Sequence, residues 1–291
     1  MAKIFSALMT PFNEDQSINE KGLEQSIEYQ IKNGVDGFYV TGSTAECFMM
    51  SPDERKRILK SVAEIVDGRV DLIAHVGAIS QYQATDMAIA ANEYGYKKIS
   101  SVVPFYFDFT FENIVKYFDE VSKDSGLPIF VYNIPATTGR SFSLDQLFKF
   151  LESDRVCGIK HTSMDFFQLE RMKKEFPNKI FMNGRDECFL SGLVVGADGM
   201  IGSTANIVPY IYKKIANSYE SGDLNSAREY QDVANKIISL LQTMEFNIGM
   251  KHILKHYGVE AGGGRKPFGE LRECDKELIE KKIIPLMESV K

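Results

Sequence analysis

The sequence predicts a (β/α)8 barrel, the TIM-barrel architecture, with a C-terminal helical extension. Eight short apolar, β-branched or aromatic runs alternate with amphipathic segments of helical period, at intervals of roughly thirty residues. Strand-like runs stop near residue 217, and only helical patterns follow. We therefore expect residues 1–217 to form the barrel that carries the active site and residues 218–291 to form the extension. An open doubly wound sheet is the alternative, but no glycine fingerprint follows the first run.

Each predicted element follows from its local pattern. The strands are short and rich in apolar residues, as expected where both faces of a parallel sheet are buried. Two helix starts are marked by capping residues, Ser51 before Pro52 and Ser143 before an acidic first turn. A glycine run at 261–265 lacks the lysine and hydroxyl of a phosphate loop, so it predicts a flexible linker. We expect strands at 4–9, 37–41, 70–76, 99–103, 129–134, 156–160, 180–183 and 199–201, barrel helices at 20–33, 52–66, 81–94, 111–122 and 144–151, and extension helices at 224–243, 245–257 and 275–288.

The composition excludes several classes of protein. Hydrophobic residues make up 44% of the 291 residues and charged residues 25%, which is typical of a soluble globular protein. The formal net charge is −6 with both signs interspersed, which argues against a nucleic-acid partner and against a polybasic membrane patch. No apolar stretch is long enough to cross a bilayer, and Pro11 ends the N-terminal apolar run too early for a signal peptide.

The cysteines and histidines do not predict a metal site. The four cysteines are widely spaced, and with the four histidines they show no zinc-ligand spacing. His252 and His256 are four residues apart on a predicted helix and could bind a metal, but without a third ligand a solvated or capping pair is the simpler interpretation. Free thiols fit a reducing cytoplasm, which is the location we expect.

Lys160 is the residue that points most directly to chemistry. It lies in an apolar run that predicts a buried strand, and burial would lower its pKa and leave a neutral amine able to attack a carbonyl. The alternative is that Lys160 ends an edge strand and extends to water. If Lys160 points into the barrel, strand alternation also turns Gly158 and Thr162 inward and His161 towards the helices. Gly158 would then leave room below the lysine, and Thr162 would form a hydrogen bond near it.

Other unusual residues follow the predicted strands, at the barrel end where catalytic groups gather. Ser43 and Thr44 follow the second strand beside a glycine and could hold a carboxylate. They could instead cap the next helix, but that helix has its own cap at Ser51. Tyr132 ends the fifth strand and could shuttle a proton, or could simply be a packed aromatic residue.

Two acidic residues follow the seventh strand. Asp186 and Glu187 suit the binding of a polyol, although acids are also favoured in the first turn of a helix. Ser203 supplies a further donor after the eighth strand. An aromatic run at 104–111, which includes Tyr106, follows the fourth strand and predicts a partner surface, unless it folds over its own barrel.

Together these motifs resemble the class I pyruvate-dependent aldolase family that contains N-acetylneuraminate lyase and dihydrodipicolinate synthase. The resemblance covers residues 5–268 and rests on the motifs at 42–44, 132–135, 158–160 and 196–203. It is closer to the lyases, because Lys160, Thr162 and Asp165 match their Lys-x-Thr-x-x-Asp pattern. Residues 183–187 also match their Asn-Gly-aromatic-Asp-Glu run except at one position. The synthases carry an arginine where this chain has Thr137.

The resemblance implies a Schiff-base lyase that cleaves N-acetylneuraminate to N-acetylmannosamine and pyruvate by a retro-aldol reaction. Lys160 would form the imine, Tyr132 would relay a proton, and Ser43 and Thr44 would hold the carboxylate of this small 2-oxo acid substrate. Tyr106 would reach into a neighbouring subunit's site in a homotetramer. No metal or organic cofactor would be needed, since the lysine is the electron sink. The residues implied for the sugar chain are Thr162, Gly184, Asp186, Glu187 and Ser203.

Two departures from the family pattern bear on the substrate. Ala45 replaces the usual glycine after the hydroxyl pair, and Arg185 replaces the usual aromatic residue beside the sugar-binding acids. The alternative functions are another pyruvate-dependent aldolase that acts on a different 2-oxo sugar acid, or the synthase. A binding protein that has lost catalysis would be expected to lack Lys160, Tyr132 or the hydroxyl pair, and all are present.

Overall fold

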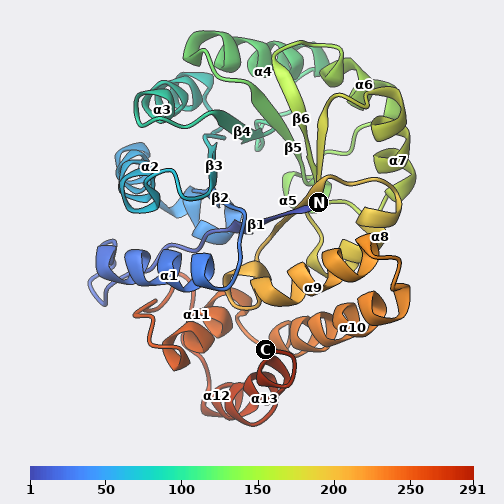
Figure 1. The fold of residues 1–291 in the computed structure, drawn as a ribbon. Helices are drawn as coiled ribbons and strands as arrows, with labels where there is room; N and C mark the ends of the chain where they lie inside the picture. The colour runs from blue at the N-terminus through green and yellow to red at the C-terminus, as the bar shows by residue number, and fades with distance from the viewer.

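The computed structural model describes the whole chain, Met1–Lys291, and its centre is a closed barrel of eight parallel strands. Each strand pairs with the next, and β8 pairs with β1 to close the ring. Figure 1 shows this ring with helices around it. The predicted barrel is confirmed. The strands are β1 (Lys3–Ala7), β2 (Gly37–Val40), β3 (Asp71–His75), β4 (Lys98–Val102), β5 (Ile129–Asn133), β6 (Val156–His161), β7 (Ile180–Asn183) and β8 (Gly199–Gly202).

Helices follow the strands and cover the outside of the barrel. Two of them begin as the sequence predicts: the hydroxyls of Ser51 and Ser143 accept hydrogen bonds from the third helical N–H of α2 and α6, completing capping boxes. The surrounding helices are α1 (Glu20–Lys32), α2 (Pro52–Val66), α3 (Gln81–Glu93), α4 (Phe111–Ser125), α6 (Leu144–Leu151), α7 (Phe166–Glu175), α8 (Phe189–Val194) and α9 (Pro209–Glu220), with one short turn, α5 (Pro135–Thr138), after β5.

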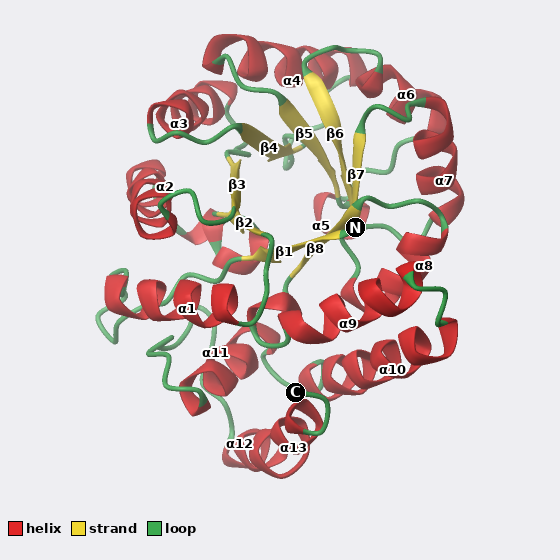
Figure 2. Ribbon diagram, in the orientation of Figure 1, coloured by secondary structure: helices red, strands yellow, loops and turns green.

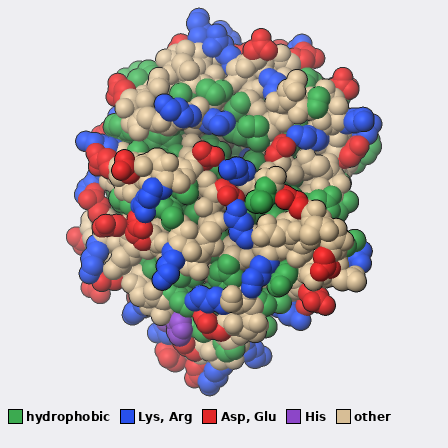
Figure 3. Space-filling view, viewed as in Figure 1, with side chains coloured by type: hydrophobic (Ala, Val, Ile, Leu, Met, Phe, Trp, Pro, Cys, Tyr) green, Lys and Arg blue, Asp and Glu red, His purple; other side chains and the backbone are tan.

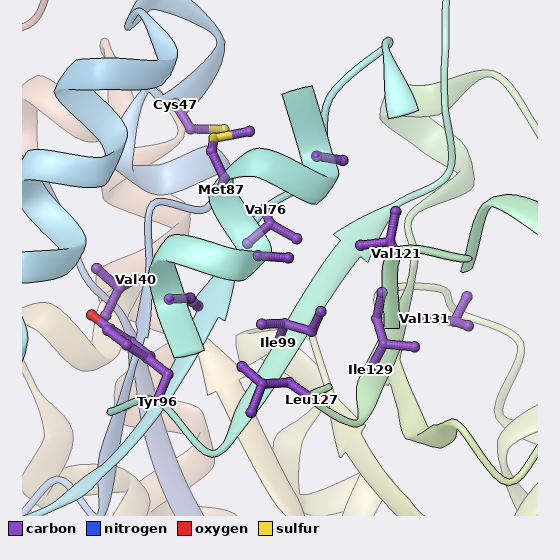
Figure 4. Packing of buried hydrophobic residues seen from close by; sticks show 14 of the residues in the cluster. Val40, Cys47, Val76, Met87, Tyr96, Ile99, Val121, Leu127, Ile129 and Val131 are labelled. Atoms are coloured by element: carbon purple, nitrogen blue, oxygen red, sulfur yellow. The ribbon is translucent and has the colours of Figure 1, made fainter. Parts of the chain in front are cut away.

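Buried side chains form an inner and an outer layer. The inner layer fills the barrel and includes Phe5, Tyr39 and Phe130. The outer layer lies between the strands and the helices, and Figure 4 shows Ile99 and Ile129 of adjacent strands in this layer with Val121 of α4. Because most strand residues are buried on both faces of the sheet, apolar residues predominate in the strands, and the sequence signal for them is strong.

The C-terminal extension is helical, as predicted, and packs against one side of the barrel. Figure 2 shows α10 alongside α9, with α11, α12 and α13 on the same side. A continuous buried cluster joins barrel residues such as Met200 to extension residues such as Leu254. Helix α9 continues to Glu220, so the division into two units at residue 217 stays a prediction. The extension contains α10 (Leu224–Leu241), α11 (Phe246–His256), α12 (Glu273–Leu278), the π-helical segment η5 (Ile279–Ile283) and α13 (Ile284–Glu288).

The prediction that the glycine run at 261–265 is a flexible joint was wrong. Gly262 forms a parallel bridge with Phe12, and a Cβ at this glycine would lie 1.8 Å from the Phe12 carbonyl oxygen. Arg265 donates two hydrogen bonds to the Glu54 carboxylate and one, of 3.0 Å, to the carbonyl oxygen of Met49. Gly262 is therefore needed for the close approach of two backbones, and the segment is anchored beside the barrel.

The surface carries charges of both signs. Figure 3 shows lysine and arginine side chains interspersed with aspartate and glutamate over the visible face. None of the helices combines the length and the apolar character that crossing a bilayer would require.

Candidate active site

Lys160 points into the barrel from β6. Its side chain is buried, and the register places it between Tyr132 of β5 and Met182 of β7. The Nζ atom lies 4.2 Å from the centre of the Tyr39 ring and 4.1 Å from the centre of the Tyr132 ring. A closed barrel has no edge strand, so the alternative in which Lys160 extends to water from a sheet edge is excluded.

The surroundings of Lys160 favour its neutral form. Burial lowers the pKa of the amine from 10.5 to about 7, and the charge of Asp186 and the thiol of Cys47 oppose this shift only in part. The two aromatic rings offer the ammonium some compensation, but they do not replace water. A substantial share of the amine is therefore unprotonated near neutral pH and able to act as a nucleophile.

Tyr132 lies beside this amine with its phenol buried. Its ring meets the Tyr39 ring edge to face at 5.9 Å, and the Tyr39 hydroxyl is fixed by a 3.0 Å hydrogen bond with Ser100. Burial raises the pKa of Tyr132 to about 12, and the hydroxyls of Ser43 and Thr162 oppose this rise. The phenol is therefore protonated at neutral pH. The buried Thr162 hydroxyl lies near enough to the phenol to affect its pKa but makes no hydrogen bond of ordinary geometry, which leaves it able to bind a ligand.

The turn after β2 brings two further hydroxyls to the barrel mouth. Ser43 and Thr44 open the short 3-10 helix η1 (Ser43–Ala45), so their N–H groups precede its first internal hydrogen bond. The Thr44 hydroxyl lies 2.7 Å from that of Ser203, which follows β8. A Cβ at Gly42 would lie 2.7 Å from the Tyr39 ring, so glycine lets this turn pack directly above the ring. Free N–H groups beside hydroxyls form a cradle suited to a carboxylate.

The acidic residues after β7 have two different environments. Asp186 is buried, and its Oδ2 atom accepts hydrogen bonds of 2.7 Å from both the N–H and the hydroxyl of Thr204. Burial raises the pKa of the Asp186 carboxyl, and the two hydrogen bonds oppose that rise. Glu187 is partly exposed, with Arg185 3.1 Å away in an ion pair. Of the two acids, Glu187 is the more accessible to a ligand.

Gly184 brings the end of β7 against the residue that follows β6. A Cβ at this position would lie 1.9 Å from the Thr162 hydroxyl oxygen. The glycine therefore allows Thr162 and the residues after β7 to share one side of the barrel mouth.

His75 lies beneath the site, and sequence patterns alone did not identify it. Its ring is fully buried, and the ring centre lies 6.0 Å from that of Tyr132. The Nδ1 atom donates a hydrogen bond to the Thr41 carbonyl oxygen at 2.9 Å, and the Nε2 atom accepts one from the Val102 N–H at 3.3 Å. Burial and the nearby Arg55 guanidinium hold the pKa of His75 well below its usual range, so the ring is neutral. Because both ring nitrogens are occupied, we assign His75 a structural role.

Two other residues of β6, His161 and Gly158, have structural roles. The His161 ring contacts the Asn133 amide at 3.2 Å and the Asp165 carbonyl oxygen at 3.0 Å, which confirms the predicted structural role. A Cβ at Gly158 would lie 1.9 Å from the carbonyl oxygen of Ile180, so the neighbouring strand requires a glycine here. That this glycine also leaves room below the lysine stays a prediction.

Tyr106 stands apart from the other predicted site residues. Its side chain is 84% exposed, and its ring packs edge-on against that of Phe107 at 5.1 Å. Its φ of 79° is unusual for a residue with a bulky side chain. In a single chain, Tyr106 therefore belongs to an exposed aromatic surface and not to the interior of its own barrel.

The two candidate metal ligands of the extension face a carboxylate. His252 Nε2 lies 3.8 Å and His256 Nδ1 lies 3.5 Å from Glu280. No group of three or more histidine, cysteine, aspartate or glutamate side chains converges as metal ligands would.

Comparisons with known proteins agree on one family. Residues 1–284 match the model of the dihydrodipicolinate synthetase family. The chain is 41% identical to N-acetylneuraminate lyase 2 of Escherichia coli O6:H1, over 96% of this chain and 92% of that protein. Among solved structures it is similar to CdNal from Clostridium difficile in complex with mannosamine (37% identity, TM-score 0.95, 100% and 99% of the two chains). It is also similar to N-acetylneuraminate lyase from Fusobacterium nucleatum complexed with pyruvate (38% identity, TM-score 0.93, 100% and 97%). These matches confirm the resemblance found in the sequence: the chain belongs to the dihydrodipicolinate synthetase family.

Proposed function

We propose that this protein is a carbon–carbon lyase that cleaves N-acetylneuraminate to N-acetylmannosamine and pyruvate by a retro-aldol reaction. The relatives named N-acetylneuraminate lyase support this assignment, as do the pyruvate and mannosamine complexes of the similar structures. One observation carries the proposal: the buried amine of Lys160, with its pKa lowered to about 7, lies beside a phenol and close to a turn suited to a carboxylate.

The first step is attack of the Lys160 nitrogen on the ketone carbon of the open-chain 2-oxo acid. Loss of water gives a protonated imine, and Ser43 and Thr44 hold the adjacent carboxylate with their hydroxyls and N–H groups. The bond then breaks between the carbon adjacent to the imine carbon and the next carbon, which carries a hydroxyl. The imine accepts the electron pair of this bond as that hydroxyl loses its proton. The aldehyde leaves, a pyruvate enamine remains on Lys160, and protonation and hydrolysis release pyruvate. No metal or organic cofactor takes part, because the imine is the electron sink.

Tyr132 is the group we assign to the proton transfers. At a pKa of about 12 its phenol does not store a negative charge near pH 7, so it passes one proton on as it receives another. The Ser43 hydroxyl lies near enough to affect the pKa of this phenol and is the neighbour in such a relay. Formation of the positively charged imine beside the Tyr132 ring would also make the phenol more acidic at the step that requires it.

The sugar chain would lie between the ends of β6, β7 and β8. The unpartnered Thr162 hydroxyl, the accessible Glu187 carboxylate and the Ser203 hydroxyl supply donors and acceptors on that side. Gly184 gives the chain room, and Asp186, which is bound to Thr204, fixes the shape of the loop and has one oxygen left for a hydroxyl.

Assembly as a homotetramer in the cytoplasm is part of the same proposal. Aromatic side chains exposed on a single chain, among them Tyr82, Tyr106 and Phe107, support burial against another subunit. In that arrangement Tyr106 would complete a neighbour's site. The four free cysteines fit a reducing compartment.

A substrate panel tests the assignment. Pyruvate release is measured from N-acetylneuraminate and from 2-oxo-3-deoxy sugar acids of other chain lengths. In the condensing direction, consumption of pyruvate in the presence of aspartate semialdehyde is measured. We expect the highest kcat/KM for N-acetylneuraminate and no turnover by Lys160→Met. A higher kcat/KM for another substrate would reassign the enzyme within its family.

A further inference from the structure

A buried ion pair connects the C-terminal extension to the turn that carries Ser43 and Thr44. Lys251 Nζ, from α11, lies 2.8 Å from Glu46 Oε1, and both side chains are fully buried although 205 residues separate them in the chain. Lys251 also donates to the carbonyl oxygen of Gly263 at 2.7 Å. The only carboxylate on this turn is therefore held by a lysine from outside the barrel.

The extension binds both oxygens of this carboxylate. Glu46 Oε2 accepts a 2.7 Å hydrogen bond from the backbone N–H of Arg265, and the Arg265 guanidinium is itself anchored on Glu54 of α2. The two bonds to Glu46 come from different directions, one from helix α11 and one from the anchored glycine-rich segment. Together they leave the side chain of Glu46 little freedom to rotate.

The backbone of Glu46 is in a conformation that needs support. Its φ of 61° and ψ of 33° lie in the left-handed region, which is unfavourable for a residue with a Cβ. In this conformation its N–H donates to the Ser43 carbonyl oxygen at 2.9 Å and closes the turn. The bonds to the Glu46 side chain therefore help to determine where the N–H groups and hydroxyls of Ser43 and Thr44 point.

The energetics of buried ion pairs indicate that the Glu46–Lys251 pair fixes the geometry of the turn more than it stabilises the fold. The free energy needed to remove two charges from water is about as large as the free energy gained from their attraction. A buried ion pair therefore stabilises a fold less than apolar packing does. An open pocket of about 510 Å³ borders Lys251 and is lined among others by Phe12 and Ile248, so the buried pair lies close to a hollow in the surface. A buried pair at such a place fixes one geometry of the loop.

We propose that Glu46 and Lys251 are positioning residues through which the extension holds the carboxylate-binding turn in its active geometry. The inference rests on the proposed role of Ser43 and Thr44. It assigns the extension a part in substrate binding that is exerted through the turn and not through contact with substrate. Disturbing the pair should weaken recognition of the substrate carboxylate and leave the chemistry of the Lys160 amine intact.

Borohydride trapping with two ketones separates these effects. Pyruvate carries the carboxylate, whereas acetone forms the same imine without one. For Lys251→Met we expect the half-saturating pyruvate concentration for trapping to rise about tenfold or more, because a misplaced turn loses charge-assisted hydrogen bonds to the carboxylate. Trapping of acetone at a fixed concentration should match the wild type. In steady state, KM for the 2-oxo acid should rise more than kcat falls.

Two further variants complete the design. Glu46→Gln combined with Lys251→Met leaves no unpaired buried charge; it should unfold at a temperature nearer to the wild type than Lys251→Met alone, yet keep a raised half-saturating pyruvate concentration. Lys213→Met is the matched control, since Lys213 pairs with Asp36 at 2.6 Å, at the opposite end of β2 from the turn. The control should trap both ketones as the wild type does.

The outcomes are distinct. If either Lys251 variant traps pyruvate at wild-type concentrations, or loses acetone and pyruvate trapping in parallel, the positioning role is wrong. If the single variant Lys251→Met does not fold, the double variant is tested in the same way, by comparing its trapping of pyruvate and of acetone with the wild type. If the wild type itself traps neither ketone, it is the proposed function that fails.

Discussion

Replacing Lys160 by methionine should make the folded protein more stable, although it removes the residue we consider essential for activity. The amine is fully buried, and burial lowers its pKa from 10.5 to about 7. Each pKa unit corresponds to about 1.4 kcal/mol, so keeping the ammonium in the barrel costs about 5 kcal/mol below pH 7. Methionine has a similar shape and no charge to desolvate.

The advantage of methionine should shrink as the pH rises. Between pH 7 and pH 10.5 the folded protein holds a neutral amine while the unfolded chain still binds a proton on Lys160. The unfolded state therefore binds more protons, and the stability of the wild type rises with pH relative to the variant. The difference in the free energy of unfolding between Lys160→Met and the wild type should fall from about 5 kcal/mol at pH 6 to about 2 kcal/mol at pH 9. The value at pH 6 is an upper limit, because water can enter around the charged amine.

Urea unfolding at pH 6, 7.5 and 9, at one protein concentration, measures this difference. Lys251→Met is the matched control, because it removes a buried lysine that is paired with Glu46. That variant leaves a carboxylate without its partner and should lose about 3–5 kcal/mol of stability. This prediction is wrong if Lys160→Met is less stable than the wild type at pH 6, or if its gain in the free energy of unfolding does not change with pH. Either result would show that the Lys160 amine is not buried in its neutral form.

Three further predictions concern other site residues. Tyr132→Phe should lower kcat by about 10²–10⁴, since it removes the proton relay, while borohydride trapping with pyruvate persists; loss of trapping would contradict this. Gly184→Ala places a methyl group 1.9 Å from a threonine hydroxyl and should raise KM for N-acetylneuraminate, whereas Gly269→Ala, which meets nothing within 4 Å, should not; equal kinetics would refute the reasoning. Mixing inactive Tyr106→Ala subunits with inactive Lys160→Met subunits should restore activity if Tyr106 acts in the neighbour's site, and no recovery would argue that it does not.

The barrel could be predicted from the sequence because its signals are local. Apolar runs with capped helices between them are sufficient to place elements such as β7 and α2 at the residues observed. Strand alternation predicts that Gly158 and Thr162 share a face with Lys160, whereas the structure shows that this face points into the barrel. The apolar run around Lys160 predicts a buried strand, but the burial that lowers its pKa comes from the closed barrel, where Tyr39 and Tyr132 of other strands lie against the amine.

Contacts between distant segments could not be predicted in this way. The Glu46–Lys251 pair joins residues 205 apart, and nothing near Lys251 in sequence distinguishes it from a surface lysine of an amphipathic helix. The glycine run before Arg265 suggests flexibility by composition, but one of its glycines, Gly262, makes a close backbone contact with Phe12. Such features depend on which surfaces meet, and a single sequence with local patterns does not contain that information.

The most direct test of the account is the site and pH dependence of imine formation. The protein is incubated with pyruvate and borohydride between pH 5 and pH 10, and the peptide that contains Lys160 is examined by mass spectrometry. We expect a reduced pyruvate adduct on Lys160 alone, with an initial rate that rises with pH around pH 7 and is level well before pH 10. An adduct on another lysine, or a rate on Lys160 that keeps rising towards pH 10 as for an ordinary exposed amine, would contradict this expectation.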